Sequence, residues 1–151
     1  MLKFSVSDTE FSFLATLLTE ENPCLINLVY RHMPLYTVLS HCIISGDAFL
    51  MPSAILSLER GLLARRKPGA LYFDAPRQTI CICCGDTAED SAVNQFGQVL
   101  ETDIRELERL AKHVDQKTFD GTVKVEVTLT GDSAPAKNLP RNLPALLGTT
   151  H

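Results

Sequence analysis

Short runs in which apolar and polar residues alternate recur along this chain, and turn residues separate them. The clearest is 122–130, where valine and leucine alternate with lysine, glutamate and threonine. Because successive side chains of a strand point to opposite faces, such a run predicts a strand with one buried and one solvated face. A chain with many such runs has to pair them into a sheet whose edges are closed or protected.

Eight strands follow from these runs and from the turn residues between them. They are expected at 2–6, 11–17, 35–44, 48–51, 70–73, 79–84, 94–100 and 122–130. Residues 52–68 show no clear period and predict a loop with one or two weak helical turns.

Two helices are expected between the strands. The first begins within 19–23, with the Thr19 hydroxyl as a cap and Pro23 in the first turn, and it stops before Pro34. The second follows a cap at Thr102-Asp103, and its apolar residues share one face. That stripe consists of Ile104, Leu107, Leu110, Ala111 and Val114.

Eight short strands and two helices predict a mainly β (α+β) fold, and a closed or nearly closed antiparallel barrel removes the exposed edges better than a sandwich does. The 151 residues, 45% of them hydrophobic, provide for one core. We expect one barrel domain over 1–130 and a flexible tail over 131–151, where prolines interrupt the leucines.

The net charge of -4 is scattered along the chain, which argues against a nucleic-acid partner. No apolar run approaches the roughly 20 residues that cross a bilayer, and the first residues lack the pattern of an export signal. We therefore expect a cytoplasmic protein with no membrane partner. Of the five cysteines, three crowd into 81–84, which favours buried thiols over disulfides or a zinc site.

The order of several short motifs resembles the compact bacterial cyclophilin-like barrels, over residues 2 to 129. The motifs are Leu-Ser-His-Cys-Ile-Ile-Ser-Gly-Asp at 39–47, Met-Pro at 51–52, Lys-Pro-Gly-Ala-Leu-Tyr at 67–72, the run 80–85 and Asn-Gln-Phe-Gly at 94–97. Within that group the chain looks most like the mikimopine and cucumopine (opine) synthases, although the extra helical region of the longer members is absent.

One departure bears on function. Proline-isomerising cyclophilins carry a catalytic arginine in a Phe-His-Arg strand, whereas the matching stretch here is Leu39-Ser40-His41. Without that cation, isomerase activity loses its main electrostatic device. A divergent proline isomerase and a non-catalytic module that binds a metabolite or peptide stay open as alternatives.

The opine-synthase resemblance implies a Pictet–Spengler condensation of L-histidine with 2-oxoglutarate, without a cofactor or a metal. Such an enzyme has to hold two polar molecules together and move protons between them. His41 is the first candidate base, with Asp47 to orient it and Tyr72 to aid proton transfer. Each has a structural alternative: a hydrogen-bonded strand histidine, a turn aspartate that bonds its own backbone, and a packed tyrosine.

Substrate carboxylates need donors, and arginine provides a planar, two-pronged one. Arg60 and Arg77 are the main candidates for this role, although surface charge explains them equally well. The other substrate-binding candidates are Ser45 in the turn, the aromatic rings of Phe49 and Phe96, and the amides of Asn94 and Gln95, which match the wall of the cyclophilin groove. A homodimer is left open by the strand edges and the apolar tail.

Overall fold

The computed structural model describes residues 1–42, 47–86, 92–117 and 121–131. These described residues form nine strands: β1 (Leu2–Val6), β2 (Ser12–Leu17), β3 (Leu35–Cys42), β4 (Ala48–Pro52), β5 (Leu62–Arg65), β6 (Ala70–Asp74), β7 (Thr79–Cys83), β8 (Ala92–Val99) and β9 (Val123–Leu129). Helix α1 spans Pro23–Arg31 and helix α2 spans Ile104–Lys117, and short 3-10 turns lie at Ala75–Arg77 and Glu101–Asp103.

The strands form one antiparallel sheet in the order β2-β1-β9-β3-β4-β7-β6-β8-β5. A further pairing of β2 with β8 closes eight of these strands into a barrel. On β8, residues 92–95 pair with β5 and residues 97–99 pair with β2, so β5 and β2 follow one another along the same edge. The prediction of a closed, mainly β barrel with two helices is confirmed.

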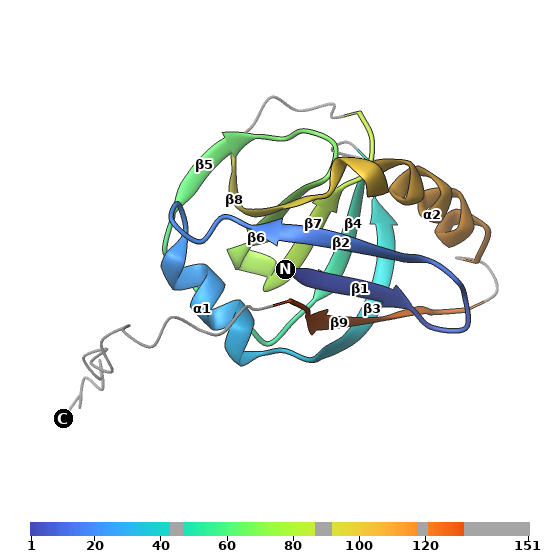
Figure 1. The fold of residues 1–151 in the computed structure, drawn as a ribbon, viewed down its shortest axis with the longest axis horizontal. Coiled ribbons are helices and arrows are strands. Elements are labelled where there is room, and N and C mark those ends of the chain that lie inside the picture. Colours follow the sequence, from blue (N-terminus) through green and yellow to red (C-terminus); the bar gives the residue numbers. More distant parts are fainter. Residues whose placement is uncertain (43–46, 87–91, 118–120, 132–151) are drawn as a thin grey trace.

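Four phenylalanines dominate the barrel interior: Phe4, Phe13, Phe49 and Phe96 are all buried. The rings of Phe4 and Phe13 stack with centroids 4.6 Å apart. Apolar side chains of both helices join the same core, and Figure 1 shows α1 and α2 on opposite sides of the barrel. These helical residues are Leu25, Ile26, Val29, Leu107, Leu110 and Val114. The predicted apolar stripe of the second helix is therefore confirmed.

A second, smaller apolar cluster lies outside the barrel. Leu71 and Phe73 of β6 belong to the main core, so Tyr72 between them points to the opposite face. There it packs with Cys81 and Val93 and their neighbours in a cluster that is also buried. This outer cluster matters below because it forms the base of a cavity.

Three local predictions are wrong. The segment predicted as loop with weak helix contains β5. Its basic residues and Gly61 are typical of a solvated loop, so the strand was not predicted. The Thr19 hydroxyl does not cap the first helix: it donates to the carbonyl of Leu17 at 3.4 Å, and the residue before the helix is Asn22. The second helix likewise lacks its predicted cap, because the Asp103 carboxylate accepts the Leu14 N–H of β2 at 2.8 Å.

Cysteines 81, 83 and 84 are buried, as predicted, whereas Cys24 is exposed and Cys42 is half-buried. Within the described ranges, none of the helices has the length and apolar character that would let it cross a membrane. The predicted tail lies outside the described residues beyond Gly131.

Candidate functional site

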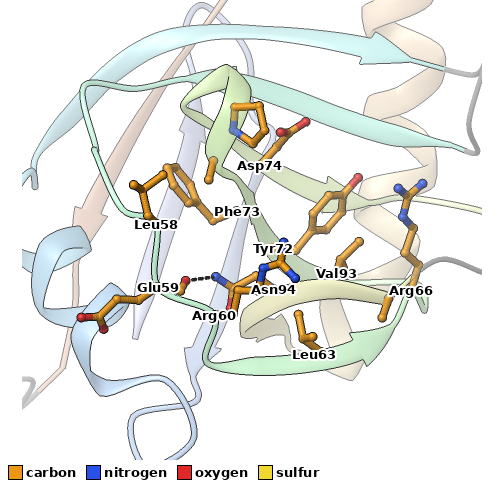
Figure 2. A pocket seen from close by; sticks show the side chains of 13 residues that line it. Leu58, Glu59, Arg60, Leu63, Arg66, Tyr72, Phe73, Asp74, Val93 and Asn94 are labelled. Atoms are coloured by element: carbon orange, nitrogen blue, oxygen red, sulfur yellow. Dashed lines mark hydrogen bonds between the residues drawn. The ribbon is translucent and has the colours of Figure 1, made fainter.

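A cavity of about 520 Å³ opens against the outer cluster. This volume lies in the range of about 300 to 1,000 Å³ that small-molecule sites occupy. Its walls come from the segment before β5, from β5 and its end, from β6 with the turn after it, and from β8 (Figure 2). The lining residues are Leu58, Glu59, Arg60, Leu63, Arg66, Tyr72, Phe73, Asp74, Ala75, Pro76, Ala92, Val93 and Asn94.

Tyr72 lies at the base of this cavity with two arginines around it. The Arg66 guanidinium lies over the Tyr72 ring, 5.4 Å from its centroid, a cation–π arrangement. In Figure 2 the Tyr72 side chain lies between those of Arg60 and Arg66. Burial raises the pKa of the Tyr72 hydroxyl above its ordinary 10.0, and Arg66 opposes this only in part. The hydroxyl therefore keeps its proton at neutral pH.

Two carboxylates border the same cavity. Asp74 lies two residues after Tyr72 on β6, so strand geometry puts both side chains on one face. Its Oδ2 accepts a hydrogen bond from Nη1 of Arg77 at 3.0 Å. Arg77, predicted to bind a substrate carboxylate, is thus paired with Asp74 and is not among the lining residues. The second carboxylate, that of Glu59, is exposed at the cavity rim.

Asn94 lines the cavity, but its amide holds the cavity wall together. Its Oδ1 accepts hydrogen bonds from Asn22 Nδ2 at 2.7 Å and from Gly61 N–H at 3.3 Å. Its Nδ2 donates to the Glu59 carbonyl at 3.0 Å. The neighbouring Gln95 is buried and donates to the Gly97 carbonyl at 3.0 Å. Both amides were predicted to bind substrate, yet their donors are occupied within the protein.

Phe49 and Phe96 were predicted to contact the substrate, but both are fully buried in the barrel core. They do not line the outer cavity. Of the described residues in 35–51 and 94–100, only Asn94 lines this cavity. The reason is the alternation of β8, in which Val93 faces the outer cluster and Phe96 faces the core. Phe96 lies at a bulge, because its neighbours Gln95 and Gly97 pair with the consecutive residues Tyr72 and Leu71 of β6.

His41 and Asp47 lie at a different place, beside α2. The His41 ring bonds through Nδ1 to Asp115 Oδ1 at 2.7 Å, and its Nε2 lies 3.4 Å from Asp47 Oδ1. The His41 side chain is only 7% exposed, and its ring centroid is 5.7 Å from that of Phe49. The imidazole therefore joins β3 and the start of β4 to the end of α2, and it does not line the cavity.

The remaining candidates either line the cavity or fall outside the described residues. Arg60, Tyr72 and Asn94 are brought together in the cavity. Ser45 lies outside the described residues, so its predicted role is not tested. Sequence reasoning missed several members of the site. They are Glu59, Arg66 and Asp74.

Another cavity, of about 420 Å³, lies between the β1–β2 turn, α2 and the start of β9. It holds none of the predicted site residues, so the cavity at Tyr72 is the candidate site. Within the described ranges, no cluster of three or more histidine, cysteine, aspartate or glutamate side chains has a geometry suited to a metal ion.

No protein-family model and no curated protein matches the sequence. Among solved structures, McbB in complex with tryptophan has a similar fold, with a TM-score of 0.78 and 18% sequence identity. The match covers 95% of this chain and 49% of McbB, so the chain spans about half the length of McbB. At this level of identity the likeness establishes a shared fold.

A second similar structure is the solution structure of the hypothetical protein AF2241 from Archaeoglobus fulgidus. Its TM-score is 0.57 at 15% identity, and the match covers 84% of this chain and 92% of that one. Together the two likenesses support the barrel architecture.

Proposed function

We propose that this chain is a cofactor-free condensing enzyme of the Pictet–Spengler type, with L-histidine and 2-oxoglutarate as its substrates. The observation that carries the proposal is the cavity itself, which a buried tyrosine lines together with two arginines and two carboxylates. The sequence resemblance to opine synthases points to the same chemistry. The likeness of the fold to McbB, which was solved with the aromatic amino acid tryptophan, supports an amino-acid substrate.

The arginines account for the binding of the acids. The two substrates carry three carboxylates in all, and a guanidinium binds a carboxylate through two parallel hydrogen bonds. Arg60 and Arg66 are the donors that line the cavity. Leu58, Leu63 and Pro76 contribute apolar surface to the cavity, which suits the flat imidazole ring.

The reaction needs a proton donor first and a proton acceptor later. The amine adds to the ketone, the adduct loses water to give an iminium ion, and a carbon of the imidazole attacks that ion. We assign the donor to Tyr72, the one hydroxyl-bearing side chain among the residues that line the cavity, which protonates the departing hydroxyl.

The final step removes the ring proton after the carbon–carbon bond has formed. We assign the acceptor to Asp74, whose carboxylate Arg77 holds in place and which shares a face of β6 with Tyr72. Glu59 at the rim is the second carboxylate within the cavity. This assignment does not use His41, because its ring is bonded to Asp115 elsewhere.

The test is mass spectrometry after the purified chain is mixed with L-histidine and 2-oxoglutarate. The expected product has the summed mass of the two substrates minus one water, and histidine deuterated on the attacked ring carbon loses that label. The variant Tyr72→Phe should lose turnover, whereas Arg105→Gln on the exposed face of α2 serves as the control. Binding of either substrate without any product would instead indicate a metabolite-binding module, and accelerated prolyl isomerisation of a peptide would indicate an isomerase.

A further inference from the structure

Asn22 is a polar side chain in a buried position, with 2% of its surface exposed. It immediately precedes α1, where asparagine usually caps the helix, yet its side chain makes no capping bond. Its Nδ2 instead donates to Asn94 Oδ1 at 2.7 Å and to the Gln95 carbonyl at 3.1 Å. The start of α1 is thereby fixed to β8.

Asn94 passes this connection on to the cavity rim. Its Nδ2 donates to the Glu59 carbonyl, and its Oδ1 accepts the Gly61 N–H. We call residues 58–61 the strap, because they run along the rim and carry both Glu59 and Arg60 to the cavity. The Asn94 side chain therefore bonds the strap backbone at Glu59 and at Gly61, on each side of Arg60.

Gly61 shows how closely the strap approaches Asn22. A Cβ atom built on Gly61 would lie 2.3 Å from both Cγ and Oδ1 of Asn22. Real Cβ contacts are much longer, so any side chain at this position would push the strap and Asn22 apart. The Asn22 amide therefore fits in its place only because residue 61 has no side chain.

We propose that Asn22 is a positioning residue for the candidate site: through Asn94 it sets the position of the strap, and hence where Arg60 stands in the cavity. The inference rests on the proposed function in so far as Arg60 binds a substrate carboxylate. Asn22 itself does not line the cavity and acts through other residues.

The variant Asn22→Asp separates hydrogen bonding from packing. It keeps the shape of the side chain but replaces the Nδ2 donor by an oxygen, which would face the Asn94 Oδ1 acceptor. If the Asn94 amide turned over to repair that contact, its oxygen would face the Glu59 carbonyl and its NH₂ would face the Gly61 N–H. In the first orientation the introduced carboxylate repels Asn94 Oδ1, and in the second the Glu59 carbonyl and the Gly61 N–H lose their partners. Either defect displaces the strap.

Cys24 provides a reporter that does not depend on catalysis. A hydrogen bond to Glu59 raises the pKa of this exposed thiol above its ordinary 9.0, and partial burial and the negative charge of Glu59 add to the rise. When the strap moves away, this influence is lost. The thiol then ionises at lower pH and reacts faster with iodoacetamide, because the thiolate is the nucleophile.

The experiment compares the full chain with Asn22→Asp and with the control Asn27→Asp on the same helix. Peptide mass spectrometry follows alkylation of Cys24 across pH 7 to 10, and steady-state kinetics follow the condensation. Asn22→Asp should alkylate Cys24 several-fold faster at pH 8 and raise KM for the keto acid about tenfold with kcat nearly unchanged, the pattern of lost ground-state binding. Asn27→Asp should match the unmodified chain in both measurements.

Unchanged alkylation of Cys24 in Asn22→Asp would overturn the inference, and so would faster alkylation with unchanged KM. If Asn22→Asp does not fold, Gly61→Ala supplies the same test, because it displaces the strap without removing a polar group. Its control is Gly121→Ala, where an added Cβ meets nothing within 4 Å. If the unmodified chain converts no substrate, the proposed function fails, and the alkylation of Cys24 alone decides whether Asn22 holds the strap.

Discussion

The Tyr72 ring lies beneath the guanidinium of Arg66, and both side chains stand on the outside of a barrel whose interior is filled by phenylalanines. The candidate chemistry therefore belongs to the outer wall. We therefore expect substitutions in the cavity to change turnover and substitutions elsewhere to change the free energy of unfolding.

Replacement of Tyr72 by phenylalanine should remove the proton donor and leave the packing of the outer cluster intact. We expect kcat for the condensation to fall about 100-fold or more, the usual contribution of general acid catalysis. The free energy of unfolding should change little, which urea denaturation would check. A fully active Tyr72→Phe variant would contradict the assignment.

Replacement of His41 by alanine should affect stability and spare catalysis. The imidazole joins Asp115 of α2 to Asp47 at the start of β4, so its loss leaves two carboxylates without their shared partner. We expect the free energy of unfolding to fall by about 1 to 3 kcal/mol, with kcat/KM within twofold of the unmodified chain. A loss of turnover without a loss of stability would return His41 to the role of base.

The buried thiols should make the fold sensitive to alkali. Burial raises the pKa of Cys81 and Cys84 to about 12 and that of Cys83 to about 11, from an ordinary 9.0. The folded chain therefore binds these protons more tightly than the unfolded chain does. Stability should be constant below pH 9 and fall as the pH rises through the range from 9 to 12.

By pH 10 each of these thiols should account for about 1 kcal/mol of lost stability. Urea denaturation at pH 7 and pH 10 measures the difference, and the variant Cys83→Ala should show a smaller one. An equal loss in that variant would assign the alkaline effect to other groups.

Substitution of Gly97 should weaken the seam that closes the barrel. An added Cβ would lie 2.8 Å from the Thr16 carbonyl oxygen of β2 and 3.2 Å from Leu71 in the core. Neither neighbour is able to move freely, because one is backbone and the other is packed. We expect Gly97→Ala to lower the free energy of unfolding by about 1 to 3 kcal/mol, with Gly121→Ala as the control in the same thermal or urea denaturation.

Alternation and turn residues were sufficient to predict eight of the nine strands and both helices. They failed at β5, because Leu62–Arg65 is short and lies between a glycine and further basic residues, so its local pattern resembles a solvated loop. Only its pairing with β8 makes it a strand. Tertiary pairing of this kind leaves no local signal.

The candidate site was harder to predict than the fold. Tyr72 and Arg60 were predicted from their chemistry and both line the cavity. His41, predicted as the base, lies beside α2 instead. The partner that decides its place is Asp115, which lies 74 residues further along the chain on the polar face of a helix. A contact over that sequence distance has no signature in a single sequence. Phe96 lies in the barrel core, and which face of β8 is the core face depends on its pairing with β6 and β2.

The two faces of strand β6, which is five residues long, have different roles. Leu71 faces the phenylalanine core, whereas Tyr72 and Asp74 face the cavity. Insertion or deletion of one residue there would exchange the two faces, burying a carboxylate and exposing a leucine. Point changes on the cavity side, by contrast, leave the core face of β6 unchanged, so the lining of the cavity can be altered without altering the barrel.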